Sequence, residues 1–318
     1  MTSYCDAHIH LFYAKEPFFD KNEQYFCVTS CHSKEEFESF GRYSQVAYEQ
    51  SPCESGYPHF RYSLHSSAPL RNAFGGATIP TAEVSPRQNH RFCRDSLKTC
   101  LASFDPAGRS LPTAHASYGI HPQVVTPSYL KNDFPMELSY LESLLSEKKI
   151  IAIGECGFDF FTPEFKATAT EQEIVFTEQL RLAQKYNLPL LLHLRKSIEK
   201  IFSYSGELKK LPSVIFHSFP GTFREAESLK KHGINAYFSF GKPILNGKKS
   251  AIECVEKLPL QNLLFETDAP YQTLKGEKET LPGDIKKVYQ RACELRKISL
   301  EEMTESILEN FMRAYFQF

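Results

Sequence analysis

Apolar residues along this chain fall into two alternating patterns. Short runs that are apolar at nearly every position, and rich in β-branched or aromatic residues, are typical of buried strands. Longer stretches with apolar residues three and four positions apart are typical of amphipathic helices. The first pattern predicts eight strands, at residues 4–12, 25–31, 115–119, 150–159, 188–194, 214–219, 236–241 and 263–265.

Helices are predicted after most of these strands, and the clearest is at residues 171–186, with Ile174, Phe176, Leu180 and Ala183 on its apolar face. Strands that are apolar throughout indicate a parallel sheet covered on both faces. Their alternation with helices predicts an α/β fold, a TIM (β/α)8 barrel, with a doubly wound open sheet as the alternative. The other helical stretches are residues 34–49, 135–147, 197–204, 223–232, 251–257 and 284–316, the last divided near residues 298–299.

One segment does not follow this alternation. Residues 51–112 are rich in Ser, Pro, Gly, Arg and His, with one short helix-like piece around residues 91–104. Structureless loops of this length are uncommon in compact domains, so we expect an insertion or irregular subdomain between the second and third strands. The whole chain, residues 1–318, is then a single barrel domain.

Composition adds information about the surroundings of the protein. The chain has 318 residues, 42% of them hydrophobic, and a formal net charge of −1. No global positive field attracts nucleic acid, so such binding would need a local patch. No run approaches the roughly eighteen apolar residues of a membrane span, which predicts no membrane association. The nine cysteines are scattered, as expected for reduced thiols. We therefore expect a cytoplasmic protein and take a monomer as the default.

Histidines and carboxylates stand where five of the predicted strands end. His8 and His10 are two residues apart, so both side chains lie on one face of their strand. Taken singly, each such residue has an ordinary explanation, such as a solvated strand end, a paired acid or a helix cap. Their agreement across five strands indicates a metal site, because active sites of these barrels form at the carboxyl ends of the strands. The candidate ligands are His8, His10, Glu155, His193, His217 and Asp268.

Six short motifs occur in order along the chain: DAHIHL near the start, GIHP at 119–122, IGECGFDFF at 153–161, HLR at 193–195, HSFPG at 217–221 and ETDAPY at 266–271. Their order and spacing resemble the TatD family of metal-dependent deoxyribonucleases, within the metal-dependent hydrolase superfamily. The resemblance covers the chain apart from residues 51–112 and, more loosely, the C-terminal helices. It implies a hydrolase of phosphodiester bonds that acts on DNA ends, with nucleic acid as its substrate.

The resemblance also implies roles for the candidate residues. Glu155 bridges two divalent metal ions, and a mixed set of His and carboxylate ligands accepts zinc, magnesium or manganese. Glu155 and Asp268 are the expected catalytic residues, and Asp268 also accepts the proton of the attacking water. The other ligands are His8, His10 and Asp268 for one ion, and His193 and His217 for the second.

Arg195 and His121 are the expected substrate-binding residues. Arg195 follows His193 by two positions, so it shares the inward face and its guanidinium can meet a phosphate, with a salt bridge at the rim as the alternative. His121 either contacts substrate or orients a metal ligand. Lysines in loops after strands are weaker candidates for contacts with a nucleic-acid backbone, namely Lys242, Lys275 and Lys278.

The chain departs from the family in Lys196 and Ser197 after Arg195, and in LKGEKETLP after the last motif. Both departures concern substrate recognition and leave the metal ligands intact. Two other functions stay open. A metal-dependent ester or amide hydrolase, such as an aminoacyl-tRNA deacylase or a lactonase, would use the same fold and ligands. A non-catalytic binding or scaffold barrel is the third reading, which the retention of all six ligands disfavours.

Overall fold

The computed structural model describes residues 2–13, 20, 22–40, 103–104, 110–111 and 113–317. Within them, eight strands form one parallel sheet in the order β1-β2-β5-β6-β7-β8-β9-β10, and β3 pairs with β4 separately. The strands are β1 Thr2–Ile9, β2 Glu23–Cys31, β3 Ser103–Phe104, β4 Ser110–Leu111, β5 Thr113–Tyr118, β6 Ala152–Asp159, β7 Leu190–Arg195, β8 Val214–Phe216, β9 Ala236–Phe240 and β10 Leu263–Phe265.

The first and last strands of the sheet meet just beyond their carboxyl ends. The backbone N–H of Asp268 donates to the carbonyl of His8 at 3.0 Å, and that of His10 donates to the carbonyl of Ala269 at 2.9 Å. These bonds join the segment after β10 to β1 and curl the sheet into a nearly closed barrel. The predicted TIM barrel is therefore confirmed, and the doubly wound alternative is wrong.

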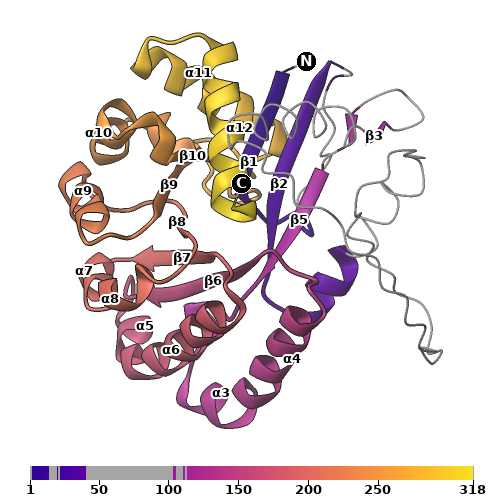
Figure 1. Ribbon diagram of the computed structural model, residues 1–318, viewed down its shortest axis with the longest axis vertical. Coiled ribbons are helices and arrows are strands. Elements are labelled where there is room, and N and C mark those ends of the chain that lie inside the picture. The colour runs from indigo at the N-terminus through magenta and orange to yellow at the C-terminus, as the bar shows by residue number, and fades with distance from the viewer. Residues whose placement is uncertain are drawn as a thin grey trace, which may run out of the picture. The chain divides into compact units, whose positions relative to one another are not determined.

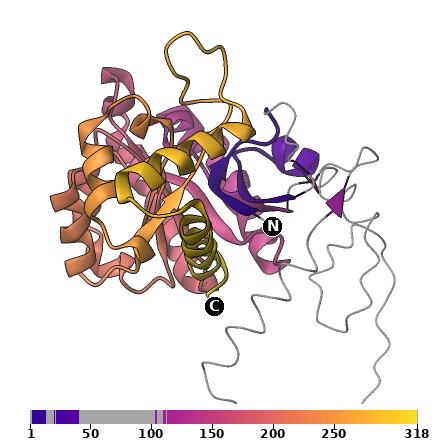
Figure 2. The same ribbon diagram turned by 90° about the horizontal axis from the view of Figure 1, so that it is seen from above.

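Most helices lie on the outer side of the strands, as Figures 1 and 2 show, whereas the C-terminal helix is drawn across the middle of the ring of strands in Figure 1. Residues 34–40 are also helical, and the rest of the predicted helix at 34–49 lies outside the described residues. The predicted helices after residue 113 are confirmed; the stretch 197–204 contains one short helix, and a second short helix follows it. The helices are α3 Pro127–Asn132, α4 Phe134–Ser146, α5 Pro163–Ala167, α6 Ala169–Tyr186, α7 Ile198–Phe202, α8 Ser205–Leu208, α9 Phe223–Lys231, α10 Lys249–Lys257, α11 Ile285–Arg296 and α12 Leu300–Phe316, with 3-10 turns η1 Pro122–Val124, η2 Lys242–Ile244, η3 Leu260–Asn262 and η4 Pro282–Asp284.

Apolar spacing does not predict the short helices α3 and α5, because neither is long enough to show a period. Both begin at a Thr-Pro pair. Thr126 Oγ1 accepts a hydrogen bond from Tyr129 N at 3.0 Å, and Thr162 Oγ1 accepts one from Phe165 N at 3.2 Å. Proline suits the first helical position, where its missing N–H is not needed, so these caps are the local signal for both helices.

The buried face of α6 differs from the predicted one. Ile174 is 44% exposed, whereas the polar Gln172 and Gln179 are buried. Gln179 exchanges two hydrogen bonds with the backbone of Ile120, at 2.7 and 3.1 Å. Gln172 does the same with Asp159, at 2.9 and 3.1 Å. These amides satisfy buried backbone groups and fix the chain at the ends of β5 and β6, where the candidate site residues lie.

A second polar network joins β1 to the segment after β10. Asp6 Oδ1 accepts hydrogen bonds from the backbone N–H groups of Thr267 and His8, at 2.9 and 3.3 Å. Asp6 Oδ2 accepts from the hydroxyls of Thr267 and Tyr25, at 2.6 and 2.7 Å. Burial raises the pKa of Asp6 to about 7, although these donors act in the opposite direction. The network fixes the two segments that carry His8 and Asp268.

The prediction of an insertion concerns residues that the structure largely leaves out. The chain divides into two compact units, residues 1–51 with 103–318, and residues 52–102. The second unit lies outside the described residues, as does most of the predicted segment 51–112, so the domain description stays a prediction. Among the described residues, no helix is long and apolar enough to cross a membrane.

Replacement of Gly157 by alanine tests the packing of β6 against β7. Gly157 has φ +135°, and a Cβ atom there would lie 2.2 Å from the carbonyl oxygen of His193. We expect Gly157→Ala to lower the free energy of unfolding by about 3 kcal/mol, because backbone must move to relieve the clash. Urea denaturation measures the change. The control, Gly206→Ala, meets nothing within 4 Å, and equal stability of the two variants would contradict the packing argument.

Candidate metal centre

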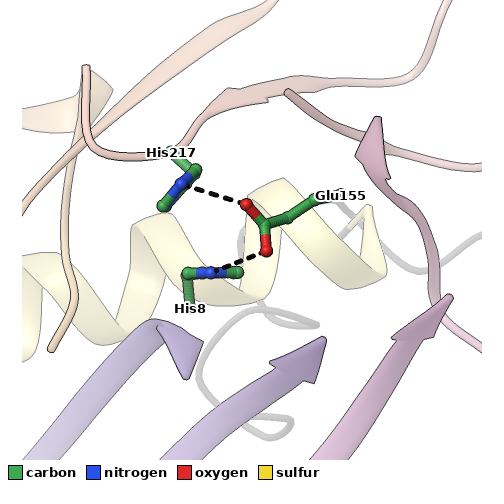
Figure 3. Close-up of side chains that lie close together, drawn as sticks. All are labelled: His8, Glu155 and His217. Atoms are coloured by element: carbon green, nitrogen blue, oxygen red, sulfur yellow. Dashed lines mark ion pairs between the residues drawn. The ribbon is translucent and has the colours of Figure 1, made fainter. Parts of the chain in front are cut away.

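Glu155 lies in β6 inside the barrel and is only 2% exposed. The pairing of β6 with β7 shifts register between Ile153 and Cys156, and such an irregularity changes the direction of a side chain. Gly154 and Gly157 flank Glu155, and both allow close approach of the β7 backbone. Figure 3 shows the Glu155 carboxylate between the imidazoles of His8 and His217, near the arrowheads of neighbouring strands.

The first carboxylate oxygen of Glu155, Oε1, faces three imidazoles. The Nε2 atoms lie at 3.2 Å for His8, 3.4 Å for His10 and 3.0 Å for His32. Asp268 Oδ1 approaches the same group, at 3.2 Å from His8 Nε2 and 3.4 Å from His10 Nε2. The structure thus brings the predicted ligands His8, His10 and Asp268 together and adds His32, which belongs to no sequence motif.

The second oxygen of Glu155, Oε2, faces a separate set of imidazoles. His217 Nε2 lies at 3.1 Å and His193 Nδ1 at 3.3 Å. His121 Nε2 is more distant, at 3.8 Å. The two oxygens of one carboxylate therefore face two groups of nitrogen atoms.

Electrostatics keep the carboxylates ionised. Burial acts to raise the pKa of Glu155, but the imidazoles of His8 and His217 outweigh it, so its pKa lies well below the ordinary range. Burial also acts to raise the pKa of Asp268, but hydrogen bonds from His10 and His8 outweigh it. The pKa of Asp268 is therefore lowered. Burial also acts to lower the pKa of His10, but Asp268 and Glu155 raise it to about 10. The centre thus holds anionic oxygens beside imidazoles that gain protons readily.

The donor atoms fit a divalent ion. His8 Nε2 and His32 Nε2 are buried and have no hydrogen-bond partner among the described residues, although carboxylate oxygens lie 3.0 to 3.2 Å away. Nitrogen and oxygen atoms that crowd together without hydrogen-bond geometry are expected where lone pairs converge on a cation. Four sets of three residues have ligand atoms within 4.8 Å of one another: His8, Glu155 and His217; His8, His10 and Asp268; His10, His32 and Glu155; His121, Glu155 and His193.

Polar side chains around the centre hold the imidazole rings in place. Ser30 Oγ lies 3.0 Å from His8 Nδ1, and Asp159 Oδ2 lies 3.3 Å from His193 Nε2, both in hydrogen-bonding geometry. Glu266 Oε1 lies 3.2 Å from His217 Nδ1, an ion-pair distance without a hydrogen bond. Such contacts fix the tautomer and orientation of an imidazole and raise its basicity as a ligand.

Glu266 is a residue of the site that no sequence pattern singled out, although a signal was available. Glu266 precedes Asp268 by two positions and directly follows β10. Residues two apart share one face of an extended segment, so the pair was open to the same reasoning as His8 and His10.

Arg195 and His121 both lie at the mouth of the barrel. The guanidinium of Arg195 lies 3.6 Å from the centroid of the Phe161 ring, and Arg195 forms no ion pair with another described residue. His121 Nδ1 accepts a hydrogen bond from Gln123 N at 3.2 Å, so its Nε2 carries the hydrogen and points toward Glu155. Burial and the neighbouring His193 hold the pKa of His121 well below its usual range.

The prediction that Lys242 could contact a nucleic-acid backbone is wrong. Its side chain is fully buried and forms ion pairs with Asp284, at 2.7 Å, and with Glu277. A lysine enclosed in this way anchors the loop after β10 and is not available to a nucleic-acid backbone. Lys275 and Lys278 are exposed.

A (β/α)8 barrel with histidines and carboxylates gathered around one buried glutamate defines the class of metal-dependent hydrolases. A family model described as TatD related DNase matches residues 73–316. The chain therefore belongs to the TatD family, and it is a metal-dependent hydrolase. The matched range does not include β1 and β2, so the resemblance of DAHIHL to the family rests on that motif itself.

Relatives agree with this assignment. The chain is 30% identical over 203 residues to YjjV, an uncharacterized metal-dependent hydrolase of Escherichia coli, covering 62% of this chain and 74% of the relative. It is 38% identical over 132 residues to the 3'-5' ssDNA/RNA exonuclease TatD of Escherichia coli, covering 40% and 49%. The crystal structure of YjjV superposes with a TM-score of 0.57 at 28% identity, over 64% of this chain and 77% of that one.

A TatD family protein of Entamoeba histolytica shares the fold across 100% of this chain and 99% of its own. The TM-score is 0.60 at 16% identity.

Addition of divalent ions to chelator-treated protein tests whether the centre binds a metal. An ion that binds only the folded chain stabilises it by about 2.7 kcal/mol at a concentration 100 times its Kd. We therefore expect zinc or manganese to raise the Tm of chelator-treated protein, as measured by calorimetry, and to leave the Tm of Glu155→Ala unchanged. Glu164→Ala, which removes an exposed glutamate, should respond like the wild type. A rise in the Tm of Glu155→Ala would argue against this centre.

Proposed function

We propose that this protein is a nuclease of the TatD type, which hydrolyses phosphodiester bonds at DNA ends with two divalent ions bridged by Glu155. The observation that carries the proposal is the division of ligands between the two oxygens of Glu155. His8, His10 and Asp268 gather on the Oε1 side, and His193 and His217 on the Oε2 side. A carboxylate that serves two such sets suits a pair of ions close enough to act on one phosphate.

When bound, divalent ions would supply Lewis-acid stabilisation of the phosphate and an activated attacking water near neutral pH. The chain supplies the proton acceptor. Asp268 is held in its ionised form, its Oδ1 faces His8 and His10, and its Oδ2 accepts a hydrogen bond from Gln272 Nε2 at 3.0 Å. A carboxylate fixed in this way is positioned to take a proton from water beside the ligand set.

His121 and Arg195 are positioned to hold two different phosphates of the substrate, His121 the one beside Glu155 and Arg195 one farther along the nucleic-acid strand. The neutral His121 keeps a hydrogen on Nε2, so it can donate to a phosphoryl oxygen beside Glu155 without competing for an ion. The Arg195 guanidinium is exposed at the end of β7, stacked on Phe161, with its donors free to bind a phosphate in bidentate fashion.

The rim of the barrel supports a nucleic-acid strand as the substrate. Phe12, Tyr13, Phe161 and Tyr271 are each between 44% and 53% exposed. The Tyr271 ring packs edge-on against His10, with 5.2 Å between the ring centroids, so an aromatic surface adjoins the ligands. Exposed aromatic rings stack with unpaired bases, and cations beside them bind the backbone. The name of the TatD relatives, 3'-5' ssDNA/RNA exonuclease, agrees with a single-stranded substrate.

Digestion of end-labelled DNA tests the proposed function. We expect single-stranded DNA to be shortened from its ends only when a divalent ion is present, with zinc, magnesium and manganese compared. Glu155→Ala and Asp268→Asn should each lower kcat/KM by at least about 10³-fold, because each removes a charge needed in the transition state.

The control variant for this assay is Glu164→Ala, which should keep full activity. Cleavage without an ion, or in Glu155→Ala, would overturn the mechanism. Hydrolysis of an aminoacyl ester but not of DNA would place the enzyme among ester hydrolases, and ion binding with no hydrolysis of either would favour a scaffold.

A variant of Arg195 separates substrate binding from chemistry. We expect Arg195→Ala to raise KM for single-stranded DNA about 10-fold while changing kcat less than about 3-fold, because a phosphate contact remote from the reacting bond is lost. Steady-state kinetics at fixed ionic strength measures both constants. The matched control is Arg181→Ala, which removes an arginine paired with Glu178 on the exposed side of α6. An unchanged KM in Arg195→Ala would remove Arg195 from the substrate site.

A further inference from the structure

His32 stands at a place in the barrel where the sequence motifs assign no function. It directly follows Cys31, the last residue of β2, and β2 lies between β1 and β5 in the sheet. The carboxyl end of β2 therefore opens on the same side of the barrel as the end of β1, which carries His8 and His10.

The His32 imidazole reaches the ligands of the Oε1 side. Its Nε2 lies 3.0 Å from Glu155 Oε1, a shorter distance than either His8 or His10 shows to the same oxygen. Its ring centroid is 5.1 Å from that of His10 and 5.2 Å from that of His121. The ligand atoms of His10, His32 and Glu155 all lie within 4.8 Å of one another.

The orientation of the His32 ring argues against a simple hydrogen bond to Glu155. Its Nε2 is buried and forms no hydrogen bond with any described residue, even though Glu155 Oε1 is 3.0 Å away. The in-plane direction from Nε2 therefore points past the carboxylate oxygen. A nitrogen that is buried, close to an anionic oxygen and not bonded to it is placed as a ligand for a cation between them.

The backbone holds His32 in this position. His32 N donates to Glu36 Oε2 at 2.7 Å, and Glu36 N donates to Ser33 Oγ at 3.2 Å, which together cap the helix at residues 34–40. The other oxygen of Glu36 accepts a hydrogen bond from Tyr13 OH at 2.8 Å. The imidazole thus extends from a fixed helix start, which is the support that a metal ligand needs.

We propose that His32 is a further metal ligand, which joins His10 and Glu155 in holding a divalent ion on the Oε1 side of the centre. This inference rests on the proposed metal centre but not on DNA as the substrate. A third imidazole on this side makes the ligand set rich in nitrogen, which favours zinc, nickel or iron over magnesium. The end of β2 therefore helps to determine which metal the enzyme uses.

Metal titration of the purified, chelator-treated protein tests the proposal without any measurement of activity. We expect His32→Ala to weaken binding of Zn²⁺ at least about 10-fold by isothermal titration calorimetry, because one ligand is lost, and to leave Mg²⁺ binding unchanged. His232→Ala, which removes an exposed histidine at the end of α9, is the matched control and should bind Zn²⁺ like the wild type. Circular dichroism checks that both variants fold.

A second variant tests by absorption spectroscopy whether residue 32 is bound to the metal. His32→Cys places a thiolate where the imidazole stood, so its Co²⁺ complex should show a thiolate-to-cobalt charge-transfer absorption in the near ultraviolet that wild-type protein lacks. Unchanged Zn²⁺ affinity in His32→Ala would overturn the role of His32, and the absorption in His32→Cys would support it.

The outcome for His32 is separable from the proposed function. If His32→Ala binds Zn²⁺ like the wild type while Glu155→Ala does not bind it, the metal centre is supported and only the role of His32 is wrong. If wild-type protein binds zinc through His32 but does not cleave DNA, only the substrate is wrong.

Discussion

The organisation of this barrel depends on one buried carboxylate. Glu155 is 2% exposed, and an ionised group in such a place is costly unless opposite charge lies beside it. The compensation comes from imidazoles on β1, directly after β1, on β7 and directly after β8. All of them must reach the same point. The β6–β7 irregularity, the Asp6 network and the glutamines of α6 can each be understood as fixing a segment that carries one of these side chains.

Two kinds of positive charge can satisfy Glu155. Without an ion, protons on the imidazoles serve, and the pKa of His10 and of His217 is raised because the neighbouring carboxylates outweigh the effect of burial. An ion on the same atoms must displace those protons, since only a neutral imidazole is a ligand. Protons and metal therefore compete for one set of lone pairs. His121 stays outside this competition, because its Nδ1 is engaged by Gln123 N and its pKa is lowered.

The sequence predicted the barrel and the positions of its six candidate ligands because both follow from local patterns, apolar runs that end in polar residues. It did not predict what depends on contacts distant in sequence. Ile174 fits the helical period of α6 but is exposed, since Gln172 and Gln179 bind backbone on neighbouring elements. In the sequence Lys242 looks like an exposed cation, but in the structure it is buried and paired with Asp284. His32 belongs to no motif, and only the convergence of β2 with β6 gives it a partner.

The bonds between the two ends of the chain also determine when the centre can exist. Tyr289 OH donates to the carbonyl of Cys5, and Tyr315 OH to that of Ala7, across 284 and 308 positions of sequence. Asp268, from the segment after β10, faces His8 and His10 of the first strand and its end. While the chain is being synthesised, β1 leaves the ribosome long before these partners do. The candidate ligands therefore cannot all come together on a nascent chain until the segment after β10 has been synthesised.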